Sequence, residues 1–77
     1  MADRIARYRA NLQGEIDSSA MYRAMAELDA QPERAEIFRR LAAVEESHAD
    51  FWRKQLADAG ASAPAPHPSW RARLLTW

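Results

Sequence analysis

The sequence predicts an all-α fold, in which an antiparallel two-helix hairpin pairs with a second copy to make a four-helix bundle. The chain of 77 residues holds two glycines and no cysteine, and its abundance of alanine, leucine, glutamate and arginine favours helix. Helical periodicity covers residues 3–29 and 32–59, and only Ala30 and Gln31 separate these stretches. Because so short a connection forces the helices to run antiparallel, residues 3–60 are expected to form one hairpin.

The charge balance and the hydropathy exclude several classes of protein. The 11 Lys and Arg residues balance 11 Asp and Glu residues, so the formal net charge is zero. Such a chain lacks the field that attracts a polyanion, which argues against nucleic-acid binding. No apolar run approaches the roughly 20 residues that a membrane span needs, and no signal-peptide pattern opens the chain. We expect a cytoplasmic protein without disulfides or thiolate metal sites.

The first predicted helix carries a narrow seam of inward-facing residues that repeat every seven positions. One series is Ile5, Leu12, Ser19 and Ala26, and the other is Tyr8, Glu15 and Tyr22. Such repeats are typical of a helix packed in a bundle. Gly14 lies in the middle of this helix, where glycine costs about 1 kcal/mol relative to alanine. We therefore expect a packing or site reason for Gly14.

The second predicted helix has a wider stripe, made of three seven-residue series. They are Phe38, Glu45 and Trp52; Leu41 and His48; and Ile37, Val44 and Phe51. One hairpin has a single mutual face, so the outer half of each stripe would stay in water. A second copy would cover that half, which predicts a homodimer or a higher oligomer built from dimers. The alternative is a monomer whose C-terminal segment folds back as a lid.

Three residues with metal-ligand side chains, Glu15, Glu45 and His48, interrupt these apolar seams. Charged groups there are expensive unless they are paired or bind a metal. Glu15 and Glu45 are equally distant from the turn, so they should face each other, with His48 one helical turn farther along. Glu45 and His48 form a Glu-x-x-His pair, a spacing that puts both side chains on one side of a helix.

A twofold dimer would gather two copies of each ligand residue, giving four carboxylates and two imidazoles in one layer. Dimetal four-helix bundles use this set, with a Glu from each of two helices and Glu-x-x-His from each of the other two. The donors suit iron, and manganese or zinc could substitute. In the alternative, an arginine would neutralise Glu15 and Glu45, but the arginines fall on the outer flanks of both helices.

Four more residues near this layer are weaker candidates. Tyr8 and Tyr22 flank Glu15 by one heptad on either side, and Trp52 stands across from Tyr8. These aromatic residues could hydrogen-bond to the ligands or take up an electron beside an oxidising metal, but core packing is the better interpretation. Glu46 points about 100° away from the preceding ligand, so we expect it to be solvated or to act as an accessory ligand.

The ligand segments also resemble a known family. Residues 8–17 (YRANLQGEID), 21–24 (MYRA) and 41–49 (LAAVEESHA) resemble the rubrerythrin-like half-ferritin domain that precedes a vacuolar-iron-transporter-type domain in membrane-bound ferritins. They are also similar to encapsulated ferritins, and the resemblance covers residues 5–59. It implies a di-iron centre with ferroxidase activity, in which the three ligand residues hold iron and dioxygen oxidises Fe(II).

Two functions other than a ferroxidase are also compatible with the sequence. One is a non-catalytic iron-sensing or iron-loading module of a membrane iron or manganese transporter. The other is a purely structural dimerisation domain. Turnover of Fe(II) in air would separate the enzyme from both.

The composition changes after the second helix. Residues 61–68 are rich in Pro and Ala and predict an extended linker, and residues 69–77 form a short amphipathic tail. In the proteins that the chain resembles, this stretch enters a membrane transporter domain at its cytoplasmic face, and docking on a protein shell is another role. Because so short a tail buries too little surface to anchor alone, we expect a disordered start of a helix.

Overall fold

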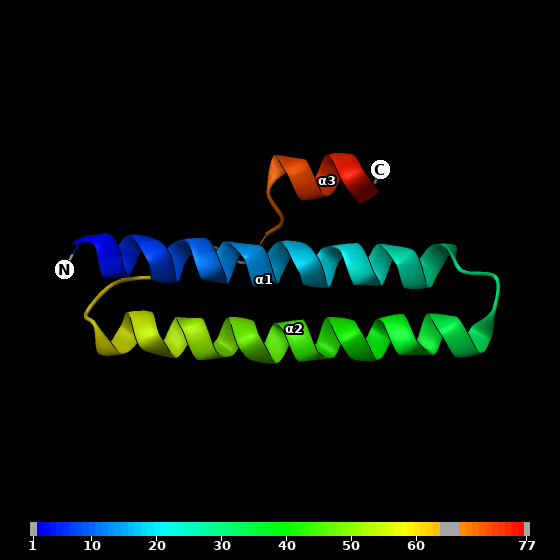
Figure 1. Cartoon of the computed structure of the whole chain (residues 1–77), viewed down its shortest axis with the longest axis horizontal. Coiled ribbons are helices and arrows are strands. Elements are labelled where there is room, and N and C mark those ends of the chain that lie inside the picture. Colours follow the sequence, from blue (N-terminus) through cyan, green and yellow to red (C-terminus); the bar gives the residue numbers. More distant parts are fainter. Residues whose placement is uncertain (1, 64–66, 77) are drawn as a thin grey trace.

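Two long antiparallel helices form the body of the protein (Figure 1). The structure is a computed structural model that describes residues 2–63 and 67–76. Helix α1 spans Ala2–Leu28 and helix α2 spans Pro32–Asp58, and the two lie side by side in one hairpin. The all-α prediction is therefore confirmed. None of the described helices has the length and hydropathy that a membrane crossing requires.

Local interactions of the turn residues set where α1 ends and α2 begins. The Asp29 carboxylate accepts a hydrogen bond from the Gln31 main-chain N–H at 2.9 Å and pairs with Arg34. Pro32 occupies the start of α2, where its missing N–H would have no partner in the helix. At the far end of α2, Gly60 adopts a φ of 75°, a left-handed conformation that ends the helix.

Small residues make much of the contact between α1 and α2. The buried residues of α2 recur every seven positions and are Ala35, Ala42, Ala49 and Leu56. Those of α1 are Leu12, Ile16, Ser19 and Ala26. Alanine allows the two helices to approach closely, and the seven-residue repeat keeps the contact on one side of each helix.

Large apolar residues of α2 lie beside this contact and not at its centre, which differs from the seam expected from the sequence. Ile37, Leu41, Val44 and Phe51 are 55%, 38%, 49% and 52% exposed. With His48 they are spaced alternately four and three residues apart, so all five share one side of α2 and are called here the outer stripe. The alanines occupy the contact because their short side chains permit closer packing.

A third helix, α3 (Trp70–Thr76), packs on the side of α1 that faces away from α2 (Figure 1). Ala72 is buried, whereas Trp70 and Leu74 are exposed. This helix replaces the disordered tail expected from the sequence. Residues 64–66 of the predicted linker and residue 77 of the predicted tail lie outside the described residues.

Three α1 side chains, spaced one helical turn apart, hold the segment that leads into α3. The bonds join Arg9 to the Ser62 carbonyl at 3.3 Å, Gln13 to the His67 carbonyl at 3.2 Å, and the Asp17 carboxylate to the Ser69 N–H and hydroxyl at 2.8 and 2.7 Å. Partial burial works to raise the pKa of Asp17, but the hydrogen bonds from Ser69 and Gln13 outweigh it, so the pKa lies below the ordinary 3.8. Asp17 therefore docks the start of α3 as a carboxylate.

Replacing Asp17 with alanine should release α3 from α1. A hydrogen bond to a charged group contributes about 1.5–3 kcal/mol, so we expect the amides of α3 to exchange hydrogen about 10-fold faster or more. The amides of α1 and α2 should keep their protection. The measurement is hydrogen exchange by mass spectrometry or NMR, with Asp50→Ala, which removes an exposed ion pair to Arg53, as control. Unchanged exchange in α3 would show that Asp17 does not dock it.

Candidate metal centre

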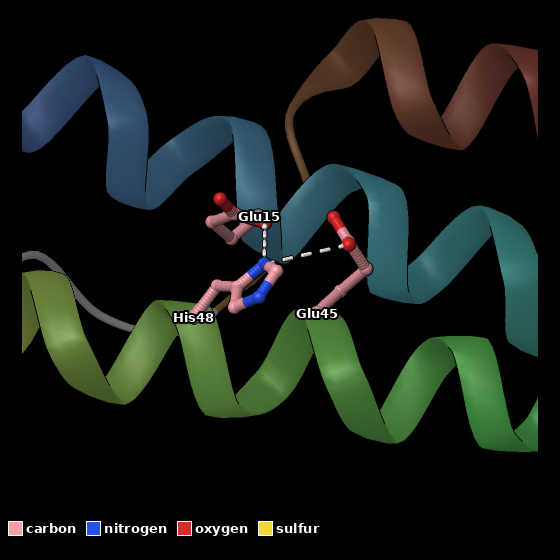
Figure 2. A group of neighbouring side chains, drawn as sticks. All are labelled: Glu15, Glu45 and His48. Carbon is pink, nitrogen blue, oxygen red and sulfur yellow. Dashed lines mark ion pairs between the residues drawn. The ribbon is translucent and has the colours of Figure 1, made fainter.

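Two carboxylates and an imidazole converge between α1 and α2 (Figure 2). Glu15 comes from α1, whereas Glu45 and His48 come from α2. One ligand atom of each residue lies within 4.8 Å of the other two. The Nδ1 atom of His48 is 3.5 Å from a Glu15 carboxylate oxygen and 3.6 Å from a Glu45 oxygen. The structure thus brings together the three residues selected from the sequence.

The helix geometry explains this convergence. Glu45 and His48 are three residues apart, so they project from α2 toward the same side. Glu15 faces Glu45 because both lie at the same distance from the turn of the hairpin. The buried alanines at positions 42 and 49 of α2 flank this level and keep α1 close enough for the side chains to meet.

The two carboxylates have little positive charge beside them to offset their mutual repulsion. Within the part of the chain that the structure describes, their one ion-pair partner is His48. A hydrogen bond with Glu15 raises the pKa of Glu45 above the ordinary 4.5, and partial burial and repulsion from Glu15 add to the shift, while His48 and Ser18 oppose it. Since desolvation and like charge both penalise the ionised pair, a bound cation would stabilise it.

The three ligand side chains differ in their exposure to solvent. The side chains of Glu15 and Glu45 are 21% and 22% exposed, whereas that of His48 is 54% exposed. His48 belongs to the outer stripe, so the group is open on the side where the large apolar side chains of α2 meet water. The ligand group is therefore accessible from solvent on this side.

Each of the three predicted aromatic residues contacts another aromatic ring. Tyr8 packs against Trp52 with ring centroids 5.5 Å apart, as their levels in the hairpin predict, and Tyr22 stacks on Phe38 at 6.4 Å. Trp52 also lines the hollow that contains both carboxylates, whereas the two tyrosines are not among the residues that line it. Trp52 is therefore the aromatic candidate that adjoins the site.

Glu46 stands apart from the three converging groups and is paired with an arginine. One of its carboxylate oxygens accepts hydrogen bonds from Arg23 Nε at 2.9 Å and from the Ser19 hydroxyl at 3.1 Å. The bond from Arg23 lowers the pKa of Glu46. Neutralisation by an arginine, the alternative weighed for Glu15 and Glu45, thus applies to Glu46. The pair links α1 to α2 next to the ligand layer.

Ser18 is a site residue that the sequence predictions missed. It lines the hollow beside both carboxylates, and its hydroxyl works to lower the pKa of Glu45. The available signal was its spacing, because a residue three positions after Glu15 lies on the same side of α1. That signal is weak, because a small polar residue occurs at that spacing by chance in a helix of this composition.

Comparison with protein families gives a match over most of the chain. Residues 9–69 match the family model described as Rubrerythrin, and this range contains all three converging residues and spans more than half of the chain. It also reaches Ser69, the residue that Asp17 holds. Comparisons with the curated proteins and with solved structures gave no match.

Substituting Glu45 by glutamine tests the repulsion between the carboxylates. The amide keeps the shape of the side chain and removes its charge, so we expect the Tm of the metal-free chain at pH 7 to rise by about 4 °C or less, because the pair is partly exposed. The folded-state pKa of Glu45 lies above 4.5, so ionised Glu45 destabilises the folded chain. This loss of stability is complete above the folded-state pKa and fades as pH falls.

The gain from Glu45→Gln should accordingly approach zero below about pH 4, where the wild-type side chain is protonated in both states. Thermal unfolding followed by circular dichroism across this pH range makes the measurement. Glu27→Gln, at an exposed position of α1, is the matched control and should leave Tm unchanged. A lower Tm for Glu45→Gln at pH 7 would contradict the account of the site.

Proposed function

The chain belongs to the rubrerythrin family of ferritin-like di-iron proteins, and we propose that it is a ferroxidase whose site forms between two identical chains. Its substrates would be Fe(II) and dioxygen. The observation that carries the proposal is the pair of facing carboxylates, Glu15 and Glu45, with His48 beside them on an open face. The family match supports iron as the metal.

The donor chemistry fits iron. Carboxylate oxygens and an imidazole nitrogen are ligands that Fe(II) accepts, and manganese or zinc would accept the same set. One chain offers three ligand atoms in the group. A dimetal bundle uses four carboxylates and two imidazoles, so a second copy would complete the set by twofold symmetry.

The outer stripe is the face on which we propose that the second copy packs. Four of its residues are large and apolar, and His48 lies among them, so a chain that covered the stripe would also close the site. Helix α3 packs on the other side of α1 and leaves this face free. The zero net charge means that two copies do not repel one another through their overall field.

Each residue of the site would have its own task. Glu15, Glu45 and His48 of each chain would together hold the two ions. Bound Fe(II) supplies the electrons that reduce dioxygen. Both carboxyl groups would bind iron in their ionised form, so acid should weaken binding. Trp52 would shield one side of the layer from water.

The finer resemblance to membrane-bound and encapsulated ferritins supports the wider setting that we propose. In it the chain would work in iron homeostasis in the cytoplasm, as a homodimer or as an assembly of dimers. The tail would lead toward a fused transporter domain or a protein shell. A non-catalytic iron-loading module would use the same ligands, so only the turnover of iron separates that alternative from the enzyme.

Anaerobic Fe(II) should raise the Tm and convert monomers to dimers, because a metal held only by the dimer stabilises it by mass action. At about 100 times the dissociation constant, the gain is about 2.7 kcal/mol. His48→Ala should abolish both effects, whereas His67→Ala, at an exposed position outside the site, should keep them. Calorimetry with sedimentation velocity makes the measurement. No shift with Fe(II), Mn(II) or Zn(II) would refute the site.

Aerobic oxidation of Fe(II) should proceed through many turnovers with the wild-type chain. Glu15→Ala removes one terminal ligand per ion, so we expect the rate to fall by about 100-fold or more. Glu27→Ala, an exposed glutamate on the same helix, should leave the rate unchanged. The measurement follows Fe(III) absorbance and oxygen consumption together. Tight stoichiometric binding without turnover would favour the iron-loading module over the ferroxidase.

A further inference from the structure

Gly14 is a residue that the fold of the single chain does not explain. It lies in the middle of the 27-residue helix α1, where glycine costs about 1 kcal/mol relative to alanine. It is exposed, and a Cβ atom built on it would meet no atom of the described residues within 4 Å. Its φ is not positive, so its backbone conformation is open to any residue. Neither the backbone nor a contact with the residues that the structure describes therefore requires glycine here.

Gly14 lines a hollow beside the candidate metal ligands. The hollow has a volume of about 380 Å³, and both site carboxylates and Trp52 also line it. Ala10 and Ser18, one turn before and one turn after Gly14, line it as well. These three small residues thus form a shallow groove along α1, next to the layer in which the ligands converge.

The groove and the outer stripe lie on the same open side of the hairpin. Glu45 lines the groove together with Ser18, and His48 in the stripe lies 3.6 Å from the same carboxylate, so the two surfaces meet at the ligands. Arg9, Gln13 and Asp17 hold the segment that leads into α3 on the other side of α1, and these three residues do not line the groove.

We infer that this groove is where a second copy of the chain approaches most closely, and that an apolar side chain of that copy's outer stripe fills it. The inference rests on the proposed shared site. The two surfaces complement each other, because the stripe presents large apolar side chains and the groove is lined by the smallest residues beside the ligands. Glycine permits an approach to the backbone that any larger residue would block.

Two variants of Gly14 test this inference. Gly14→Leu fills the groove, and Gly14→Ala adds one methyl group. Both introduce stronger helix formers into open space, so each variant should keep the helicity of the parent. In sedimentation velocity with anaerobic Fe(II), we expect Gly14→Leu to raise the dimer dissociation constant by about 10-fold or more, with a smaller rise for Gly14→Ala. Ala43→Leu, at an exposed position of α2 outside the stripe, should leave it unchanged.

The outcomes separate this inference from the proposed function. A Gly14→Leu chain that dimerises as tightly as the parent overturns the groove inference and leaves the shared site intact. A parent that stays monomeric with Fe(II) overturns both. An equal loss of dimer in Ala43→Leu also overturns the inference, because the effect would then not be specific to the groove. If Gly14→Leu loses helicity, the dissociation constant of Gly14→Ala decides the question.

Discussion

The two facing carboxylates of Glu15 and Glu45 are the constraint on which the rest of this small protein depends. Their placement between packed helices is unfavourable for the bare chain, because like charges meet in a partly dry position with only an imidazole beside them. A cation between the helices converts that repulsion into attraction. The same pair that limits the stability of the metal-free hairpin would thus drive metal binding, and through it the assembly of two chains.

The alanines at the helix contact determine the side of the hairpin on which the two carboxylates and His48 are accessible. Because Ala42 and Ala49 occupy the contact, the helices approach closely and the larger apolar residues of α2 are left on the outer stripe. His48 stands in that stripe, so the ligand group opens toward the same side as the uncovered apolar surface. Burial of the stripe and completion of the site would therefore be one event. Docking α3 through Asp17 on the other side of α1 keeps that event unobstructed.

Much of this arrangement could be predicted from the sequence, because helical periodicity and a short turn determine which residues share a level. That is why Glu15, Glu45 and His48 were expected together and do converge. The contact residues of α2 were harder to predict. A periodic pattern is recognised from its large apolar side chains, whereas the helices here pack through alanine. The docking of Ser69 on Asp17 could not be predicted, because the main-chain N–H and hydroxyl of a single serine, 52 positions away, leave no periodic pattern in the sequence.

The most direct test is to determine iron content and mass on the same sample, by metal analysis of fractions from sedimentation equilibrium after anaerobic loading. A site shared by two chains predicts two iron ions in each dimer and none in the remaining monomer. Iron that is bound at full occupancy by chains that stay monomeric would contradict the central claim, because each hairpin would then hold its metal without a partner.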